Sequence, residues 1–502
     1  MKISNIKLGL ILSYVSLVTH AVISIIYAPI LIRFLGKNEY GLYNLSTSIT
    51  GYLSVLSFGF VNTYLRYYSK YKVENDNKKI ADLNGLYLIV FSCIGFLSLL
   101  AGAIIVLNIS NIFQESLTPE ELGKAKILIS IIVVNVSVSF PLGIFQFFLT
   151  AQERFVFIRL ISLAETIIYP CLVVCALHLG FRSVSMTVIA LGMAVVAKTI
   201  QIIYCFSRCG YSISLKSVDL GMFRSIFVFS SYIFLNIVAE QLNLEVDKFV
   251  LGKYRGTADV AVYGIAAHLN AIYLSIANNI ATVVKPRVNR LVLSENSNGT
   301  NALFIKIGRL QIIVLSLIVM GFAFIGRQFV LLWVGNDFVD SYSIALLLML
   351  PFTLSHIQLL SAEVQRAKNL HKFRSILYFV VAIMNLSISI PLGRRYGGIG
   401  CATGTAISVI LGHIIIMGVY NQRVVGLSIT GLLKNALSFV PALIAPAIAG
   451  ITLNRFLIID SISRFIFSGA VIVLVFSVSM WLIGLNEYEK GLVLSPLKKL
   501  RR

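Results

Sequence analysis

Long apolar segments, separated by short polar turns, follow one another along the whole chain. A segment of about 20 apolar residues can cross the roughly 30 Å hydrocarbon core of a bilayer as a helix. No segment shows the alternation of a barrel strand, and an apolar helix satisfies its own backbone hydrogen bonds. The pattern predicts fourteen transmembrane helices, at residues 8–32, 42–65, 83–107, 127–150, 157–179, 184–206, 224–244, 260–284, 307–334, 342–362, 374–393, 398–420, 432–453 and 463–484.

Composition agrees with this pattern. Of the 502 residues, 58% are hydrophobic and only 13% are charged, so polar side chains are too few to cover a water-soluble globule of this size. The sequence therefore predicts an all-α integral membrane protein with about 14 transmembrane helices.

The distribution of basic residues predicts the orientation. An even number of spans places both termini on one side, and about two-thirds of the 42 lysines and arginines lie in the turns of that side. The positive-inside rule then puts both termini in the cytoplasm. The formal net charge of +21 is divided among many short turns, which indicates topology and attraction to anionic membrane lipid, not nucleic acid binding.

The sequence lacks the usual marks of an enzyme. No loop is long enough for a folded domain, no cluster of His, Asp or Glu stands out at the span ends, and there is no GxxxxGK[ST] phosphate loop. The six cysteines show no CxxC spacing, so we expect no metal site. These features predict a protein that is not an enzyme and needs no cofactor, and that is driven by an ion gradient, a substrate gradient or a partner.

A charged turn near the N-terminus recurs later in the chain. The stretch IRFLGKNEYGLYNL at 32–45 has a counterpart in KFVLGKYRGTADVAVYGI at 248–265, so that Leu-Gly-Lys at 35–37 appears again at 251–253. The same offset in numbering relates AQERF at 151–155 to AKNLHKF at 367–373, and Tyr204 to Tyr420. Three anchors at one offset indicate two copies of a six-helix unit. Because six is even, both copies have the same orientation, a parallel repeat that is typical of transporters.

This repeat predicts the domain organisation. Residues 1–210 would form one six-helix bundle and residues 211–425 a second, pseudo-symmetric one around a central cavity. Residues 426–502 would add two helices and a basic cytoplasmic tail. In the first turn, we expect Gly36 to end the first span with a left-handed cap. We also expect Arg33 to pair with Glu39 across it.

A resemblance to a known family is carried by PILIRFLGKNEYGLYNLSTSITGYLSVLSFGFVNTYLRYYSKY, residues 29–71. This stretch resembles the opening of Wzx-type polysaccharide and O-antigen flippases, members of the multidrug, oligosaccharidyl-lipid and polysaccharide exporter superfamily. The resemblance covers roughly residues 5–425, and further similar stretches lie at 245–273, 331–351, 367–386 and 394–408. Many relatives are assigned twelve spans, so the last two predicted spans depart from the family.

The resemblance implies a fold and a function. The fold would be two six-helix bundles that form a V-shaped cavity. The function would be translocation of a polyprenyl-pyrophosphate-linked oligosaccharide, such as an O-antigen, capsule or exopolysaccharide repeat unit, across the bacterial inner membrane by alternating access. The implied partners are the undecaprenyl pyrophosphate glycan, membrane lipid, and the polysaccharide polymerase and chain-length regulator of the same pathway.

Basic residues inside the spans are the first candidates for substrate contact, because fixed positive groups can replace the hydration of a pyrophosphate. Lys198 lies about eight residues from the end of its span, which is about 12 Å deep. Glu165, at matching depth in the preceding span, is its expected partner. The pair would contact pyrophosphate or a coupling proton, or would be a structural salt bridge.

Further candidates lie toward the span ends. Glu240 and Asp247, with Glu245 between them, are expected to carry protons or ions, or to be solvated end charges with Asp247 paired to Lys248. Arginines suit phosphate oxygens because they can bind two of them at once, and otherwise serve as topology determinants. The candidate cavity arginines are Arg33, Arg66, Arg154, Arg287 and Arg290, and Arg366 lies at the same predicted cytoplasmic mouth.

Two other functions remain open. A multidrug or small-molecule exporter of the same superfamily would export cationic compounds, whereas the basic composition favours an anionic cargo. A membrane enzyme of polysaccharide assembly is the third reading, and the duplicated halves favour a rocking transporter over it. The sequence does not identify the glycan, the coupling ion or the oligomeric state.

Overall fold

The computed structural model describes residues 3–57, 60–215, 220–457 and 459–500. All regular secondary structure in these ranges is helical. Contacts divide the chain into two units, Met1–Gly264 with Gly393–Gly397, and Ile265–Leu392 with Gly398–Arg502. The domain boundaries expected at 210 and 425 stay a prediction.

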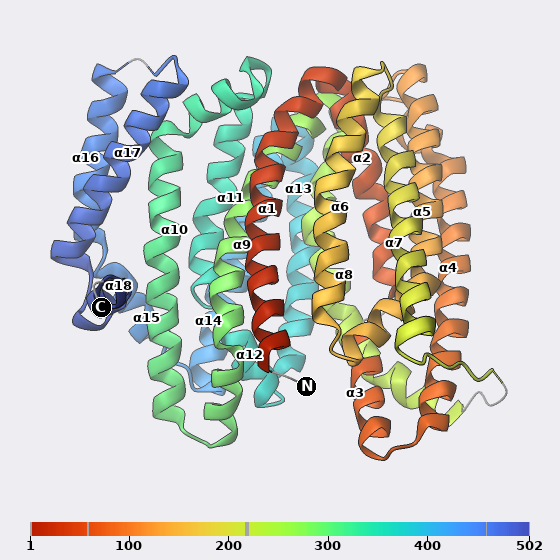
Figure 1. The fold of residues 1–502 in the computed structure, drawn as a ribbon. Coiled ribbons are helices and arrows are strands. Elements are labelled where there is room, and N and C mark those ends of the chain that lie inside the picture. Colours follow the sequence, from red (N-terminus) through yellow and green to blue (C-terminus); the bar gives the residue numbers. More distant parts are fainter. Residues whose placement is uncertain (1–2, 58–59, 216–219, 458, 501–502) are drawn as a thin grey trace. The chain divides into compact units, whose positions relative to one another are not determined.

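The described residues of the first unit form eight α-helices and the beginning of a ninth. In Figure 1, α4, α5 and α7 run side by side, and α1 packs along α6. The elements are α1 (Ile3–Leu35), α2 (Lys37–Gly51), the 3-10 segment η1 (Tyr52–Ser57), α3 (Phe60–Val73), α4 (Asn77–Phe113), α5 (Pro119–Ala151), α6 (Phe155–His178), α7 (Ser183–Arg208) and α8 (Leu220–Tyr254). Helix α9 (Thr257–Leu293) begins in this unit.

The second unit is built around α10, which packs against α11, α15, α16 and α17. Its elements after α9 are α10 (Ser297–Val334), η2 (Asn336–Phe338), α11 (Asp340–His356), α12 (Ser361–Ala367), α13 (His371–Ser408), η3 (Val409–Ile416), α14 (Met417–Tyr420), η4 (Asn421–Val425), α15 (Ile429–Leu437), α16 (Val440–Phe456), α17 (Ile462–Ser479), η5 (Met480–Gly484) and α18 (Glu487–Leu500). Of these, η3, η4 and η5 are π-helical.

The predicted fold class is confirmed, but the count of fourteen spans is not. Within the described residues, ten helices are long and apolar enough to cross a membrane, or eleven if the bent pair Ile429–Leu437 and Val440–Phe456 forms one span. The predicted spans 374–393 and 398–420 correspond to two helical segments that meet at a kink at Gly397, whose φ of 62° and ψ of −141° are not helical. The predicted span 42–65 is divided between the short helices α2 and α3, and includes residues 58–59, which lie outside the described ranges.

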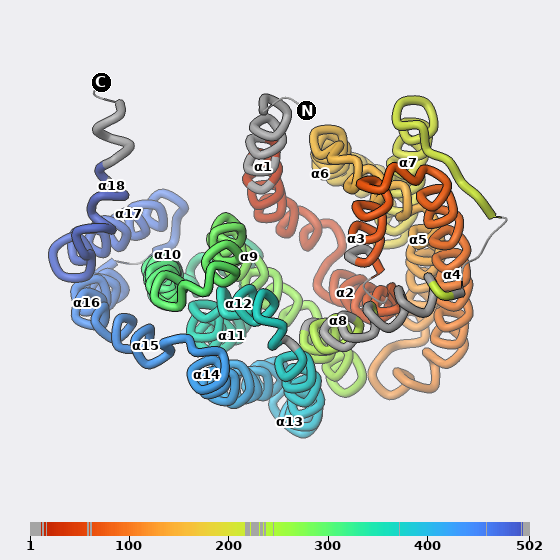
Figure 2. The backbone as a smooth tube through the Cα atoms, turned by 90° about the horizontal axis from the view of Figure 1, so that it is seen from below, coloured from red at the N-terminus to blue at the C-terminus, as the bar shows by residue number. Residues whose placement is uncertain are grey.

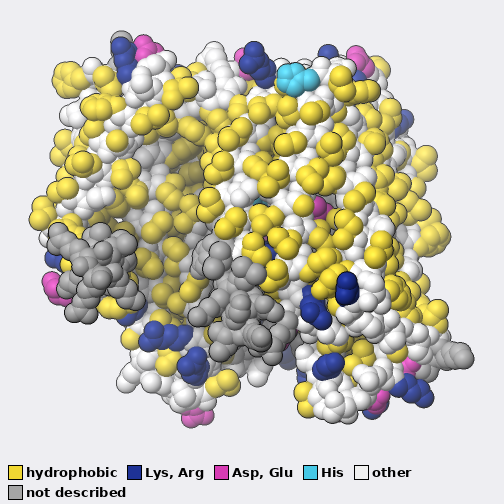
Figure 3. All heavy atoms as spheres, viewed as in Figure 1, with side chains coloured by type: hydrophobic (Ala, Val, Ile, Leu, Met, Phe, Trp, Pro, Cys, Tyr) yellow, Lys and Arg dark blue, Asp and Glu magenta, His cyan; other side chains and the backbone are white. Residues whose placement is uncertain are grey.

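The surface of these helices is apolar where lipid would contact it. On α4, Phe96, Ile104 and Leu107 are more than half exposed. On the face seen in Figure 3, hydrophobic side chains cover the middle of the molecule, and charged side chains gather mostly near its upper and lower edges. A water-soluble protein would not leave so much apolar surface exposed, so the helices are placed in a bilayer.

Residues with a left-handed backbone recur at a nearly constant offset along the chain. Asn75 and Glu295, with φ of 55° and 53°, each precede the residue that caps the next helix. Four further pairs lie at almost the same offset in numbering: Gly36 and Gly256, Glu153 and Asn369, Gly180 and Gly397, and Gly210 and Gly426. A duplicated unit would produce such pairs, because each copy would end its helices with the same turns.

The positions that correspond between the two copies of the turn differ from those predicted from the sequence. Gly36 has φ 78° and ψ 171°, and the corresponding positive φ is at Gly256, with φ 88°, not at Gly252, which lies inside α8. The expected left-handed cap at Gly36 is confirmed only in the sign of φ, because its ψ of 171° is extended and not left-handed helical. When Gly36 is matched to Gly256, Asp259 takes the position that Glu39 has in the first copy.

Glu39, in the first turn of α2, is 8% exposed and joins three helices. It accepts hydrogen bonds from the Ser183 backbone nitrogen (3.0 Å), from Ser183 Oγ (2.8 Å) and from Arg182 Nη1 (3.3 Å). Lys124 Nζ of α5 lies 3.5 Å from it. The expected pairing with Arg33 is wrong, because Arg33 is exposed on α1 while residues at the starts of α5 and α7 hold the carboxylate.

Opposing effects act on this carboxyl, which precedes the predicted second span. Burial raises the pKa of Glu39, but the hydrogen bonds from Ser183 and Arg182 and the charge of Lys124 outweigh burial. Together they hold the pKa below its ordinary value of 4.5.

A second buried ion pair fixes the C-terminal helices to α10. Arg309 Nε and Nη2 donate to the two Glu489 carboxylate oxygens over 2.7 Å and 3.0 Å. Arg309 also donates to Asn435 Oδ1 of α15 and to the Gly484 carbonyl, and its guanidinium lies 4.4 Å from the centre of the Phe439 ring. Because Arg309 and Glu489 are both less than one-tenth exposed, their mutual contacts replace hydration for both charges.

Replacement of Glu39 by Gln is expected to lower the free energy of unfolding by about 1–3 kcal/mol at neutral pH, because a buried acceptor site is lost. The difference in the free energy of unfolding between the wild type and Glu39→Gln should be fully present above about pH 4.5. It should disappear as the pH falls through the lowered pKa of Glu39 in the folded protein. Thermal unfolding in detergent across this pH range measures both effects. The control Glu120→Gln removes an exposed partner of the same Lys124 and should change stability by less than about 0.5 kcal/mol.

Arg309→Met is expected to destabilise the protein by about 3–5 kcal/mol, because Glu489 would remain buried without its counter-ion. The double variant Arg309→Met, Glu489→Leu should recover most of that loss. A double-mutant cycle by thermal unfolding measures the coupling. Arg464→Met, which breaks the exposed pair with Asp460, is the control and should have little effect. An equal loss of stability in Arg309→Met and Arg464→Met would contradict a stabilising role of the buried Arg309–Glu489 pair.

Candidate functional site

The predicted intramembrane lysine lies between three helices of the first unit. Lys198 is on α7, and its Nζ donates a hydrogen bond of 2.7 Å to Gln146 Oε1 of α5. Glu165 of α6 acts on Lys198 electrostatically, but among the ion pairs between described residues none joins the two. The partner expected from the sequence is thus replaced by a neutral amide.

Two glutamines extend this polar group, and the sequence analysis did not single them out. Gln146 accepts from Lys198, and Gln201, one turn further along α7, is 4% exposed with no hydrogen-bond partner for its Oε1. Ala197, Gln201 and Cys205 form the buried side of α7, and Cys205 Sγ contacts the Phe145 carbonyl of α5. The signal available in the sequence was the spacing of Lys198 and Gln201, which places both on one side of a helix.

The three acidic residues near the end of α8 lie in different environments. Glu240 is exposed, and Glu245 pairs with Lys248 over 2.9 Å. Asp247 is 1% exposed and accepts a hydrogen bond from the Tyr263 hydroxyl of α9. The alternative reading of an Asp247–Lys248 surface pair is wrong, because Lys248 binds Glu245 and Asp247 is buried.

The candidate arginines also differ in their surroundings. Arg154, at the start of α6, is half-buried, and its Nε has no hydrogen-bond partner among the described residues. Arg366 lies 3.2 Å from the buried Glu363 of α12, which also pairs with Lys285 of α9 over 2.9 Å. The others are exposed: Arg33, Arg66, Arg287 and Arg290. Arg366 is therefore occupied by a carboxylate, while the roles of the others stay predictions.

Comparison with known proteins places the chain in a family. Residues 7–292 match the family model described as polysaccharide biosynthesis protein. A putative O-antigen transporter of Shigella flexneri is 20% identical over 400 residues, which are 78% of this chain and 92% of that protein. An uncharacterized membrane protein, EpsK, of Bacillus subtilis (strain 168) is 20% identical over 493 residues, 95% of each protein.

Solved structures share the fold at low identity. The lipid II flippase MurJ, in an inward closed conformation, matches with a TM-score of 0.73 and 17% identity over 98% of this chain and 99% of that one. An inward-facing multidrug resistance MATE family transporter of the MOP superfamily matches with a TM-score of 0.66 and 12% identity, over 83% and 95%. The fold is therefore that of these membrane transporters. Since the family model covers more than half of its residues, the chain belongs to the polysaccharide biosynthesis protein family.

Proposed function

We propose that the protein is a flippase that moves a polyprenyl-pyrophosphate-linked oligosaccharide across a bacterial inner membrane. The observation that carries the proposal is Lys198, an ammonium within a membrane span of a polysaccharide biosynthesis protein, which is hydrogen-bonded to a neutral amide. A lysine held by Gln146 keeps its positive charge available for an anion, whereas direct pairing with a carboxylate would neutralise it. Intramembrane ionisable groups are costly and usually functional.

The physical task of such a protein is to lower the cost of moving sugars and phosphates through hydrocarbon. Burying one unpaired polar group costs several kcal/mol, and an isolated charge costs far more. Lys198, Gln146 and Gln201 supply one cation and two amides within the first unit. Arg154, whose Nε lacks a partner in the described structure, would provide a further donor for phosphate oxygens.

The mechanism belongs to the same proposal. Two like-oriented six-helix bundles, 1–210 and 211–425, would alternately open a cavity to the two sides of the membrane, with both termini in the cytoplasm. The recurring left-handed turns support a duplicated unit. The likeness to the O-antigen transporter supports a lipid-linked glycan as cargo. The polymerase and chain-length regulator of the pathway are the candidate partners.

A small-molecule exporter is the second candidate, because MATE multidrug transporters share the fold. The two functions require cargo of opposite charge. A cationic drug would be repelled by Lys198, whereas an anionic lipid-linked glycan would be attracted to it. Expression in a drug-sensitive strain that lacks its own exporters separates them. Unchanged drug sensitivity, with restored polymer in a flippase-deficient strain, supports the glycan cargo.

Lys198→Met is expected to reduce polymer export by about tenfold or more, because the cation for the pyrophosphate is lost. Lys198→Arg should retain most of the activity. The measurement is surface polymer, with inner-leaflet undecaprenyl-linked repeat units, in a strain that lacks the gene and carries each variant at equal abundance. The control is Lys126→Met, which removes one exposed positive charge from α5. Wild-type export by Lys198→Met would refute a substrate role for this lysine.

Asp247 is the group we propose for proton or ion coupling, with Glu165 and Glu240 as the other predicted candidates. Its titratable neighbours are Glu245 and Lys248 of α8, Tyr263 of α9 and Tyr52 of η1. A carboxylate that exchanges a proton makes the rate depend on pH, and an amide at its position cannot.

In proteoliposomes loaded with lipid-linked oligosaccharide, acidifying the outside should change the wild-type flipping rate. With Asp247→Asn, the flipping rate should no longer change with the external pH. The control Asp259→Asn alters a partly exposed carboxylate, paired with Arg255, at the start of α9 and should keep the response. A wild-type rate that is insensitive to external pH would argue against proton coupling.

A further inference from the structure

A polar pocket lies at the end of the first unit where three chain connections meet. It has a volume of about 330 Å³. Helices α3, α4, α5 and α7 pack together in the first unit (Figure 2). The lining of the pocket comes from the end of α3, the start of α4, the end of α5 and the segment after α7: Tyr68, Lys72, Asn77, Ile80, Asn84, Phe148, Gln152, Cys209, Gly210 and Ser212.

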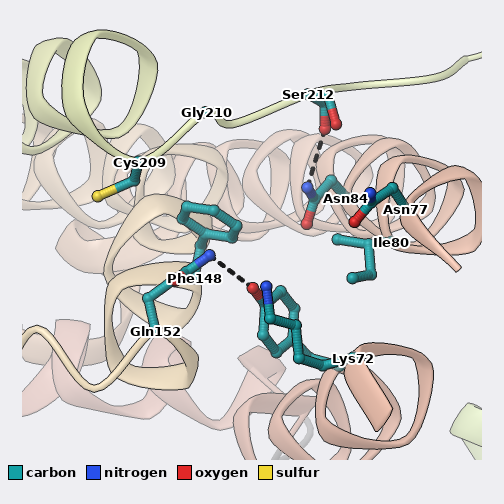
Figure 4. A pocket seen from close by; sticks show the side chains of 10 residues that line it. Lys72, Asn77, Ile80, Asn84, Phe148, Gln152, Cys209, Gly210 and Ser212 are labelled. Carbon is teal, nitrogen blue, oxygen red and sulfur yellow. Dashed lines mark hydrogen bonds between the residues drawn. The ribbon is translucent and has the colours of Figure 1, made fainter. Parts of the chain in front are cut away.

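The lining carries positive charge and neutral hydrogen-bonding groups. Lys72 is the only charged residue among the ten, and no lining residue is a carboxylate. Figure 4 shows Lys72, Gln152 and Asn84 around the same space. Asn77 is the first residue of α4, so the pocket also borders the positive end of a 37-residue helix. These groups are suited to an anion.

The acidic residues of the neighbouring turn are engaged with other lysines. Asp76 accepts from the Lys79 backbone nitrogen and lies 3.1 Å from Lys79 Nζ, and Glu74 lies 4.0 Å from Lys70 Nζ. Within the described part of the chain, Lys72 forms no ion pair. Lys72, which lines the pocket, therefore lacks a carboxylate partner, whereas Lys70 of the same helix and Lys79 of α4 each have one.

The walls of the pocket are held in place. Asn84, fully buried on α4, donates to the Ser212 carbonyl over 2.9 Å and accepts from the Tyr64 hydroxyl over 2.6 Å. Gln152 donates to the Tyr68 hydroxyl over 2.7 Å. The Ser214 nitrogen donates to the Ala81 carbonyl, which fixes the segment after α7 against α4. The site is thus formed before any ligand arrives, which reduces the entropic cost of binding.

We propose that this pocket binds one phosphate group, with Lys72 as its counter-ion and Asn77 and Ser212 as hydrogen-bond donors. The volume is at the lower end of ligand pockets, which suits a phosphate with a small polar substituent and not an oligosaccharide. The pocket lies where the long apolar helices α4 and α5 begin and end, the level at which phospholipid headgroups sit. An acidic phospholipid headgroup is therefore the expected source, and a free phosphate is the alternative source of the same chemistry.

The test compares the reactivity of two lysines on α3 in the wild-type protein. Lys72 lines the pocket, whereas Lys70 lies outside the lining beside Glu74. The protein is placed in nanodiscs of phosphatidylcholine with or without phosphatidylglycerol and treated with an amine-acetylating reagent. Peptide mass spectrometry then gives the two rates. Bound phosphate should slow Lys72 about fivefold relative to Lys70, the effect expected for one lysine near anionic lipid.

Inorganic phosphate added to phosphatidylcholine nanodiscs distinguishes the sources. If it leaves Lys72 unprotected while phosphatidylglycerol protects it, the ligand is a lipid headgroup; if it protects Lys72 equally, the site takes soluble phosphate. Native mass spectrometry provides a second readout: Lys72→Gln should lose one bound phosphatidylglycerol, and the matched control Lys70→Gln should lose none. Equal rates for both lysines in every condition, or the same lipid count for both variants, would overturn the proposal. Neither readout depends on transport.

Discussion

The interior of a bilayer offers no water, so a polar group between these helices is costly wherever it finds no partner in the protein. This constraint decides where the chain can place a charge. Arg309 is buried because Glu489, Asn435 and the Gly484 carbonyl surround it. Tyr64, Asn84 and the Ser212 carbonyl form a similar chain of hydrogen bonds at the end of the first unit. Polar contacts of this kind fix which helices are neighbours, since apolar surfaces alone would be equally satisfied by lipid.

Close packing supplies the rest of the helix association. On α4, a Cβ at Gly102 would lie 2.2 Å from Val133 of α5, and one at Gly95 would lie 2.5 Å from the Ser137 carbonyl. Both positions therefore require glycine for the present approach of the two helices. With Ser98, which is fully buried between them, these residues form a strip of small side chains along α4. Such strips allow the dispersion contacts that replace the hydrophobic effect within a membrane.

Hydropathy was sufficient to predict the helices, because in lipid an apolar segment of this length has few alternatives to a helix. Hydropathy could not predict which side chains contact one another across the helices. Glu39 and Ser183 are far apart in the chain, and nothing near Glu39 indicates that α7 begins beside it. Lys198 was assigned to Glu165 by depth and opposite charge, whereas the angular position of Gln146 on α5 brings the amide into contact. Leu-Gly-Lys recurs at 35–37 and 251–253, but the positive φ of Gly36 recurs at Gly256, and a pattern of residue types does not reveal the φ of a turn.

The basic residues of this protein differ in the groups that contact them. Arg309, Lys285 and Arg366 lie within ion-pair distance of buried carboxylates, which leaves little of their charge for a ligand. Lys198 is bound to an amide, and Glu165 acts on it electrostatically without forming an ion pair with it among the described residues. An anion that reaches Lys198 gains a charge-assisted hydrogen bond without breaking an ion pair. In the proposed flippase function, this arrangement would allow release of the cargo, because the neutral amide could hold the lysine again once the anion had left.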